Sequence, residues 1–374
     1  MSIDLKKQST FNFGNGMSVP HISKDRRYWL VRTDYGKFFD DFLINSYVAI
    51  GWDYLSKNDF IMDERNMLVS LDSIRTLISI NETFNSSSPD STIKAEITKT
   101  LNKIKYFVCD MSIGDIVIVP SKNSEYFLMG IISSDVQEVD NYAEKYQLEH
   151  PHSTIQPCPY KKRREVRWLK KLEKKKLDIY LTRALHTQHA VANMDEYASY
   201  INRNLFDNYI LGDNFHSLLK TTSENSLSLG DLHFIISMYV ENIEFLAKTY
   251  NIPITPDDID IKINIHSPGI AEFVTDLSQL SLLGEEGLQV AIPLLIAWKG
   301  PDLVRDIAST AKDIYATYKH EETECKRIDS EERRHNKDYQ LKMKELEAKL
   351  GIKTPNLSES EGLSDDDNNK QNKQ

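Results

Sequence analysis

Residues 114–132 read GDIVIVPSKNSEYFLMGII, and this stretch decides the first half of the fold. The run 116–119 is β-branched and apolar, and Pro120 stops it, which is typical of a buried strand. The short polar run 121–125 predicts a hairpin loop. The apolar run 126–132 is then the partner strand, so the stretch predicts an antiparallel hairpin.

The sequence before this hairpin predicts further strands and one helix. Residues 28–32, YWLVR, alternate large apolar groups with others, which indicates a half-buried strand. Residues 48–52, VAIGW, predict a second short strand. Apolar residues at three- and four-residue spacings predict a helix over 92–109. The mixture indicates an α+β region, for which we take residues 26–210 as the bounds.

A basic run follows the hairpin at residues 160–176, YKKRREVRWLKKLEKKK. It carries ten Lys or Arg against two Glu, within a chain of net charge −10. So concentrated a charge favours a polyanionic partner, and nucleic acid phosphate is the commonest one. Trp168 beside Arg167 adds a flat apolar face that suits a base. The alternative is a solvated basic helix face.

Composition places the chain among ordinary globular proteins. Its 374 residues allow two or three domains, with 40% apolar and 27% charged residues. The three cysteines form no CxxC pair, which argues against zinc ribbons and thioredoxin-like chemistry and fits a reducing cytosol. The N-terminus lacks the apolar core of a signal peptide, and no apolar run reaches the length of a membrane span. We therefore expect a cytoplasmic protein with no stable membrane span.

The regions outside 26–210 differ in character. Residues 259–265 alternate isoleucine with polar residues and predict a half-buried strand. Residues 211–252 carry an apolar stripe at helical spacing and predict helix. The predicted order is a flexible lead at 1–25, an α-rich module at 211–300 with that one clear strand, a long charged helix at 301–352 and a disordered acidic tail at 353–374.

Three stretches together resemble a known domain family. They are YWLVRTDYGKFFDDFLINSYVAIGWDYL at 28–55, YFVCDMSIGDIVIVPSKNSEYFLMGII at 106–132 and REVRWLKKLEKKKLDIYLTRAL at 164–185. Their order resembles the N-terminal domain of Mrr-type and related restriction proteins. The resemblance implies a PUA-like, EVE-type β-barrel that binds nucleic acid, in several relatives by reading modified DNA bases. It also implies a nucleic-acid-sensing component of a bacterial anti-phage defence or restriction system.

Individual positions match the family's features in this sequence. The matches are Trp29 and Arg32 on the first strand, Gly51 and Trp52 as the GW step, Gly114 and Asp115 as the GD turn, Gly130 on the following strand, and Arg167 with Trp168. Mrr-type proteins usually continue into a nuclease domain, and no such domain is recognisable in the second half. This departure puts a cleavage activity in doubt.

The predicted nucleic-acid contacts combine the basic run with this resemblance. Trp29 and Trp52 are either walls of a base pocket or core residues of the barrel. Arg32 lies on a strand, where a buried guanidinium needs a partner, and Tyr35 lies beside a turn where it can face a phosphate. The candidate nucleic-acid-binding residues are Trp29, Arg32, Tyr35, Trp52, Lys161, Lys162, Arg163, Arg164, Arg167 and Trp168.

Other readings of the chain stay open. Asp258 and Asp260, followed by Lys262, suggest an unrecognised nuclease centre, although the same residues suit the solvent face of an amphipathic strand. Residues 280–298 suit a buried helix pair, an oligomer interface or a membrane-active hairpin. We predict a homo-oligomer or a partner effector bound through residues 270–350. No catalytic residue, metal or cofactor is predicted, and the choice between DNA and RNA stays open.

Overall fold

Two units divide the chain in this computed structural model. The central unit is Asp25–Leu205, and the flanking unit combines Met1–Lys24 with Phe206–Gln374. The structure describes residues 10–12, 18–60, 67–84, 88–185, 189–220, 254–264 and 270–277, together with single helical positions between 230 and 248.

The central unit mixes strands with helices, so its class is α+β. Its strands are β3 (Tyr28–Val31), β4 (Tyr47–Ile50), β5 (Ile116–Pro120), β6 (Tyr126–Ile132), β7 (Gln137–Glu138), β8 (Lys162–Glu173) and β9 (Val191–Asn193). Its α-helices are α1 (Phe39–Ile44), α2 (Met67–Asn81), α3 (Asp90–Lys105), α4 (Tyr142–Glu149), α5 (Ile179–Ala184) and α6 (Ala198–Leu205). A π-helical turn, η3 (Tyr106–Asp110), follows α3, and four 3-10 turns are η2 (Lys57–Asp59), η4 (Lys122–Ser124), η5 (Lys174–Lys176) and η6 (Asp195–Tyr197).

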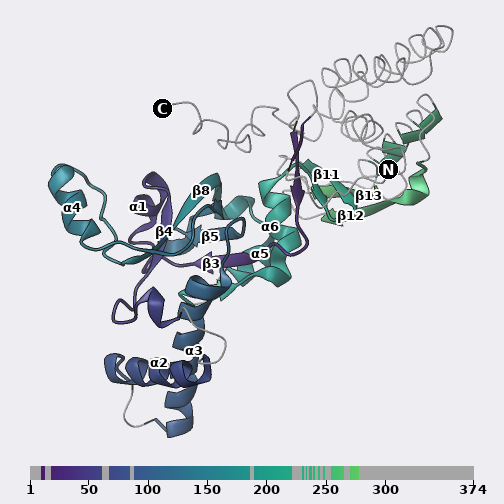
Figure 1. The fold of residues 1–374 in the computed structure, drawn as a ribbon. Coiled ribbons are helices and arrows are strands. Elements are labelled where there is room, and N and C mark those ends of the chain that lie inside the picture. Colours follow the sequence, from purple (N-terminus) through teal and green to yellow (C-terminus); the bar gives the residue numbers. More distant parts are fainter. Residues whose placement is uncertain are drawn as a thin grey trace, which may run out of the picture. The chain divides into compact units, whose positions relative to one another are not determined.

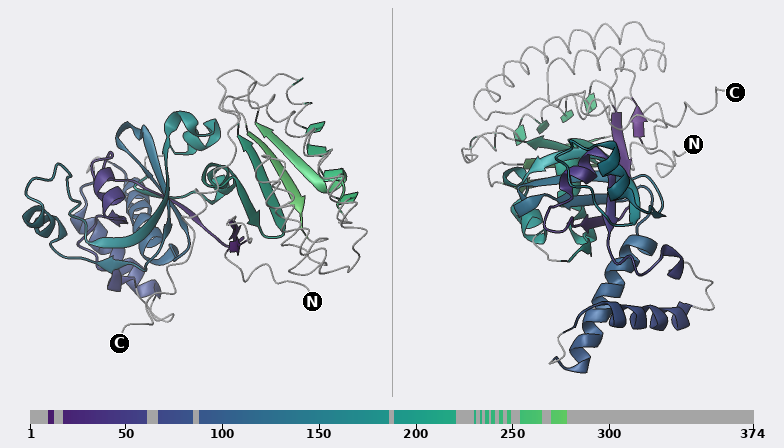
Figure 2. Two further views of the ribbon diagram at one scale, coloured as in Figure 1. Left: turned by 90° about the horizontal axis from the view of Figure 1, so that it is seen from above. Right: turned by 90° about the vertical axis from the view of Figure 1, so that its left-hand side faces the viewer.

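The strands of the central unit form one curled sheet, a half-barrel in the order β4-β8-β6-β5-β3-β9, with β7 also paired to β8. Strands β3 and β5 are parallel, and the other neighbours are antiparallel. Helices α2 and α3 project away from this sheet (Figure 1), and the right-hand view of Figure 2 shows the same projection. Because β8 joins β4 to β6, the basic run is built into the middle of the fold.

The hairpin and the helix predicted before it are both confirmed. Strands β5 and β6 pair from Ile116↔Ile131 to Pro120↔Phe127, with η4 as the connection. Helix α3 buries Ile97, Leu101 and Ile104. Because these residues recur at three- and four-residue spacings, they share the buried face of the helix.

Strand β3 differs from its prediction. All four of its residues are buried, whereas alternation predicted a half-buried strand. Trp29 and Val31 belong to the core cluster on one face. On the other face Tyr28 donates a hydrogen bond from its hydroxyl to Asn202 on α6, at 2.9 Å. The strand therefore lies between two covered faces, which a single sequence segment does not reveal.

The flanking unit contains a second sheet. Its strands are β1 (Thr10–Asn12), β2 (Ser18–Ile22), β10 (Asn208–Leu211), β11 (Asn214–Lys220), β12 (Ile259–Asn264) and β13 (Ile270–Asp276), and η7 (Pro256–Asp258) precedes β12. Their order is β1-β2-β10-β11-β13-β12. The left-hand view of Figure 2 shows β11, β13 and β12 as neighbouring arrows, which agrees with their antiparallel registers.

Of the predictions for the flanking regions, one is wrong, one is wrong in part and one is confirmed. The flexible lead contains β1 and β2, and β2 pairs with β10 through Ile210↔His21. The helix predicted over 211–252 is wrong at its start, because Asn214–Lys220 form β11 and pair with β13 from far along the chain. The described positions between 230 and 248 are helical, as predicted. The strand predicted at 259–265 is present as β12, with Asp260 and Lys262 exposed. The predictions for 280–298, 301–352 and 353–374 lie outside the described residues.

Candidate nucleic-acid interface

The basic run is strand β8 and η5, and its first three cations are buried. Lys162, Arg163 and Arg164 are at most 5% exposed. The ammonium of Lys162 donates to the carbonyl oxygens of Trp52 and Leu55, at 2.8 Å each. The carboxylate of Asp53 lies 3.4 Å away and supplies a counter-charge. Desolvation lowers the pKa of this lysine, and Asp53 opposes that change.

Arg164 is held entirely by backbone carbonyls. Its Nε donates to Phe107 at 2.9 Å, and its Nη2 donates to Val108 at 3.1 Å. Its Nη1 donates to Ser134 at 3.1 Å. Phe107 and Val108 lie in the π-helical turn after α3, and Ser134 follows β6. The guanidinium therefore fastens the end of a helix to the sheet, and burial lowers its pKa.

Arg163 fills an aromatic cage. Its guanidinium lies 3.6 Å from the ring centroid of Tyr142 and 4.3 Å from that of Tyr47. It also donates to the carbonyl oxygen of Cys158, at 2.6 Å. Both tyrosine hydroxyls donate to the buried carboxylate of Asp41. Burial, and then this carboxylate, raises the pKa of Tyr142 to about 12.

The first half of the run is thus structural in this conformation. Lys161 is its exposed member, and its ammonium pairs with Asp140 at 2.8 Å. We predicted phosphate contacts from Lys162, Arg163 and Arg164 as well. Their charged ends are already satisfied inside the fold, because a buried cation needs partners. Any phosphate contacts must therefore come from other cations, which are exposed.

The tryptophans named as candidates are also engaged by the fold. Trp29 is fully buried, and its Nε1 donates to the carboxylate of Asp115 at 2.9 Å. Trp168 is partly buried and donates from Nε1 to the carbonyl oxygen of Phe42, at 2.9 Å. Trp52 is partly exposed, with φ of 60°. Of the two suggested pocket walls, only Trp52 thus presents part of its ring to solvent.

Arg32 is held by the fold, whereas Tyr35 is exposed to solvent. Arg32 is partly buried, and its Nη2 donates to the carbonyl oxygen of Leu185 at 2.8 Å. Tyr35 is 93% exposed, in the loop between β3 and α1. Arg167 is also exposed, on the outward side of β8. Tyr35 and Arg167 are therefore the accessible members of this part of the prediction.

Several exposed or half-exposed cations gather at one end of the sheet. Strand register places Glu173 opposite Tyr126, and the amide of Lys174 donates to the carbonyl oxygen of Glu125 at 2.8 Å. The loop after β3 reaches the same end, because β3 is parallel to β5. We call this set the basic rim: Lys37, Lys122, Lys171, Lys174, Lys175 and Lys176, with Tyr35 and Tyr126 among them.

The two loops of the basic rim pack tightly together. A Cβ on Gly36 would lie 2.1 Å from the backbone nitrogen of Lys122, so only glycine fits there, and its φ is +88°. Four of the seven non-glycine residues with positive φ in the described chain lie in these loops: Asp34, Tyr35, Asn123 and Ser124. Strained backbone of this kind is concentrated at functional sites.

The charges of the basic rim are weakly held. The loops and turn of the rim carry six lysines against the three carboxylates Asp34, Glu125 and Glu173, so the rim is positive on a chain of net charge −10. Glu173 pairs with Lys175 at 2.8 Å and with Lys176 at 3.6 Å, and both lysines are more than half exposed. Lys171 lies 4.8 Å from the ring centroid of Tyr126. Exposed pairs contribute little stability, so an incoming phosphate can replace them.

Sequence reasoning reached the basic rim only in part. The basic run extends to Lys176, but the candidate residues predicted from it end at Trp168. Lys37 follows Tyr35 and was visible as a neighbour of the turn. Lys122 carries no local signal, because only the pairing of β5 with β6 brings it to the rim.

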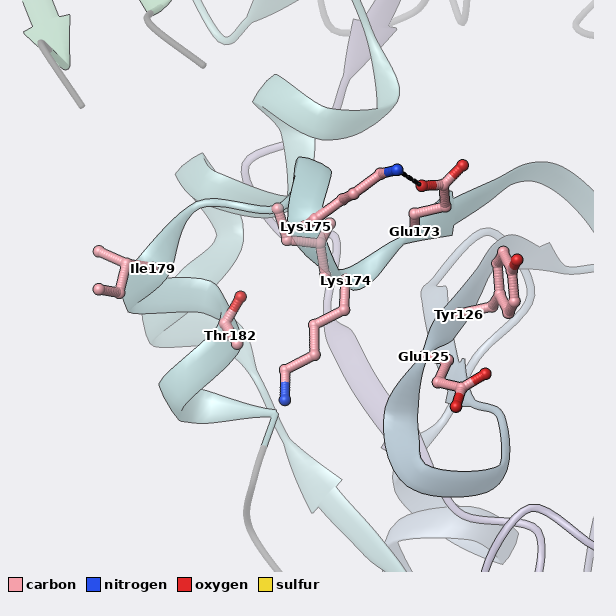
Figure 3. Close-up of a pocket in the computed structure, with 8 residues that line it drawn as sticks. Glu125, Tyr126, Glu173, Lys174, Lys175, Ile179 and Thr182 are labelled. Carbon is pink, nitrogen blue, oxygen red and sulfur yellow. Dashed lines mark ion pairs between the residues drawn. The ribbon is translucent and has the colours of Figure 1, made fainter. Parts of the chain in front are cut away.

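A groove of about 530 Å³ opens beside the basic rim, between α5 and the β5–β6 hairpin. In Figure 3 the side chain of Lys174 extends between Thr182 and Glu125, while Lys175 turns away to pair with Glu173. The residues that line it include Glu125, Tyr126, Glu173, Lys174, Ile179 and Thr182. The groove thus combines both charges with apolar surface.

The proposed nuclease residues belong to the flanking unit. Asp258 forms a capping box with Thr255, the N-cap of η7, and its carboxylate accepts from the amide and the hydroxyl of Thr255, at 2.8 Å each. Asp260 is exposed on β12. Within the described ranges, no three or more His, Cys, Asp or Glu side chains are grouped to hold a metal ion. In the same part of the chain, no helix has the length and apolar character needed to cross a membrane.

Comparison with known proteins gives one result for the central unit. A family model described as a domain of unknown function (DUF8426) matches residues 28–195. Neither the curated proteins nor the solved structures contain a match to the chain. The matched range begins at the first residue of β3 and ends shortly after β9, so it follows the curled sheet and the basic rim.

Proposed function

We propose that the central unit is a PUA/EVE-like domain that binds nucleic acid, DNA in the first instance, through the basic rim. The single observation that supports this most strongly is the gathering of six lysines and two exposed tyrosines at one end of the sheet. Lysines on two loops and one strand end suit the spaced charges of a phosphate backbone. The exposed rings of Tyr35 and Tyr126 offer surfaces on which a base can stack.

The role of the whole chain is a further part of this proposal. The resemblance to the N-terminal domain of Mrr-type proteins supports a sensing component of a bacterial anti-phage defence or restriction system. In that arrangement the central unit detects the nucleic acid, and the region after residue 210 assembles or docks a partner. The α-rich character of that region remains a prediction for residues 278–374.

The geometry favours backbone contacts over a deep base pocket. Trp29 and Trp168 already donate hydrogen bonds within the fold, so neither ring is free to sandwich a flipped base. Recognition of a modified base therefore falls to Trp52, Tyr35 and the groove. If all six rim lysines contact phosphates, the logarithm of the affinity falls with the logarithm of salt at a slope of about −5.

The experiment uses purified full-length protein and matched DNA duplexes, unmodified or carrying cytosine modifications, together with an RNA duplex. Anisotropy at two salt concentrations, with magnesium present, is followed by a denaturing gel. We expect salt-sensitive binding and intact DNA. Absence of binding at the lower salt concentration contradicts the proposal, and cut DNA supports the nuclease alternative near Asp258 and Asp260 instead.

A further inference from the structure

We infer that the groove beside the basic rim receives one extruded or single-stranded nucleotide whose base carries an amino group. This inference rests on the proposed function, because the rim must first hold the strand. The groove has a volume of about 530 Å³ and is open to solvent, so it can receive one nucleotide without enclosing it. A nucleotide that remains stacked in a duplex does not enter such a recess, so the ligand must leave the stack.

The charges in the groove are separated. Glu173 is paired with Lys175, so that carboxylate is occupied. Lys174 and Glu125 line the same groove, and neither forms an ion pair with any described residue. Figure 3 shows the ammonium of Lys174 directed between Thr182 and Glu125. Opposite charges that share a groove without pairing suit a ligand with both an anion and a hydrogen-bond donor.

A nucleotide has both groups. Its phosphate matches the ammonium of Lys174 as a charge-assisted contact. The exocyclic amino group of cytosine or adenine matches the carboxylate of Glu125, since carboxylates accept from such groups. The ring of Tyr126 and the side chain of Ile179 provide apolar surface for the base. Thymine lacks the amino group and is the natural negative comparison.

The apolar and charged parts of the groove come from different elements. Tyr126 begins β6, Lys174 begins η5, and Ile179 and Thr182 belong to α5. Backbone pairing fixes their spacing, since the amide of Lys174 donates to Glu125 and Tyr126 faces Glu173 across the strands. The groove therefore adjoins the basic rim. A nucleic-acid strand that is bound by the rim lysines then lies next to the opening of the groove.

The test compares three labelled duplexes: fully paired, with one unpaired cytosine, and with one unpaired thymine. We expect wild-type protein to bind the cytosine bulge about 5-fold more tightly than the paired duplex, and the thymine bulge with little preference. Glu125→Ala removes a negative charge, so it should bind the paired duplex at least as well as wild type. Its preference for the cytosine bulge should fall below about 2-fold.

Glu96→Ala on α3 removes an exposed carboxylate outside the groove and is the matched control, with the preference intact. Free cytidine monophosphate separates the two sources of the ligand. If it displaces the bulged duplex from wild type but not from Glu125→Ala, the groove binds the nucleotide alone. If the bulge is preferred and the free nucleotide does not compete, the groove needs the strand. Both outcomes support the site.

Equal affinity of wild type for the bulged and paired duplexes overturns the inference, as does a preference that survives in Glu125→Ala. Binding of the paired duplex is read separately in the same series. If paired DNA binds and the bulge preference is absent, the groove assignment fails and the proposed function stands. If no duplex binds, the proposed function fails, and the inference that rests on it fails with it.

Discussion

The two halves of strand β8 carry the same kinds of residue and use them in opposite ways. Residues 162–166 pair with β4 and β7 as well as reaching β6, and their cations are turned inward. Residues 167–173 pair with β6 alone among the described strands, and their cations reach solvent. In β8, the cations that lie beside β4 and β7 are therefore buried in the fold, and those beside β6 alone are exposed or half-exposed.

This comparison corrects the simplest interpretation of a basic run. Ten positive side chains in one stretch suggest one continuous binding surface, but three of them satisfy buried carbonyls. The net positive charge available to a polyanion is therefore smaller than composition indicates. Part of that loss is offset by Lys37 and Lys122, which other loops bring to the same end.

Arg164→Met tests the buried half and should have the largest effect on stability. The change leaves three buried carbonyls without their donor, so the free energy of unfolding should fall by about 3 kcal/mol. Chemical denaturation followed by circular dichroism measures it. Arg167→Met, at an exposed position of the same strand, is the control and should cost much less. Equal losses in both variants would show that burial does not distinguish the halves.

Trp168→Phe examines the point where the two halves meet. The variant removes the hydrogen bond from Nε1 to the carbonyl oxygen of Phe42 and leaves the rim lysines in place. We expect a loss of about 1–2 kcal/mol in unfolding free energy and no more than a small change in DNA affinity. A fluorescence-monitored denaturation and a binding titration on the same sample measure both. A large loss of binding at full stability would instead make Trp168 a direct nucleic-acid contact.

Alkaline pH should loosen the aromatic cage around Arg163. Burial and the Asp41 carboxylate raise the pKa of Tyr142 to about 12, against about 10 for an unfolded tyrosine. The folded state keeps this proton where the unfolded state loses it, so stability is lost as pH rises from about 10 to about 12. Unfolding midpoints between pH 8 and pH 12 should therefore decline less steeply for Tyr142→Phe. Tyr35→Phe, at an exposed ring outside the cage, is the matched control for the loss of one tyrosine hydroxyl.

Lys161→Gln should have the smallest effect. Its ammonium is exposed and pairs with Asp140 across the surface, and such pairs contribute little. We expect an unchanged unfolding midpoint and nearly unchanged DNA affinity, measured by thermal melting and anisotropy. A loss of affinity as large as that of a rim lysine would extend the interface into the first half of the run.

The sequence predicted those parts of the fold whose signal is local. The hairpin of β5 and β6, the apolar face of α3 and the alternation of β12 each depend on neighbours within a few residues. The helix predicted from residue 211 was wrong over Asn214–Lys220, because β11 is specified by its partner β13, fifty or more positions later. Pairing over such distances leaves no periodic pattern in the segment itself.

The candidate site was predicted only where its residues carry a local signal. Tyr35 and the basic run were identified because loops and charge clusters are visible in the sequence. The burial of Arg164 depends on carbonyls at Phe107 and Ser134, which are far from it along the chain. The position of Lys122 depends on strand register. Local charge therefore indicates a nucleic-acid partner, but the folded sheet decides which cations can meet it.

The most direct measurement is the salt dependence of DNA affinity for wild type and two triple variants. The rim triple variant combines Lys171→Gln, Lys175→Gln and Lys176→Gln. The charge-matched control on α3 combines Lys94→Gln, Lys99→Gln and Lys103→Gln. The rim triple variant should lose at least about tenfold in affinity and about three units of salt slope, while the α3 variant should keep the wild-type slope. Equal slopes in all three proteins would contradict the assignment of nucleic-acid binding to the exposed half of the basic run.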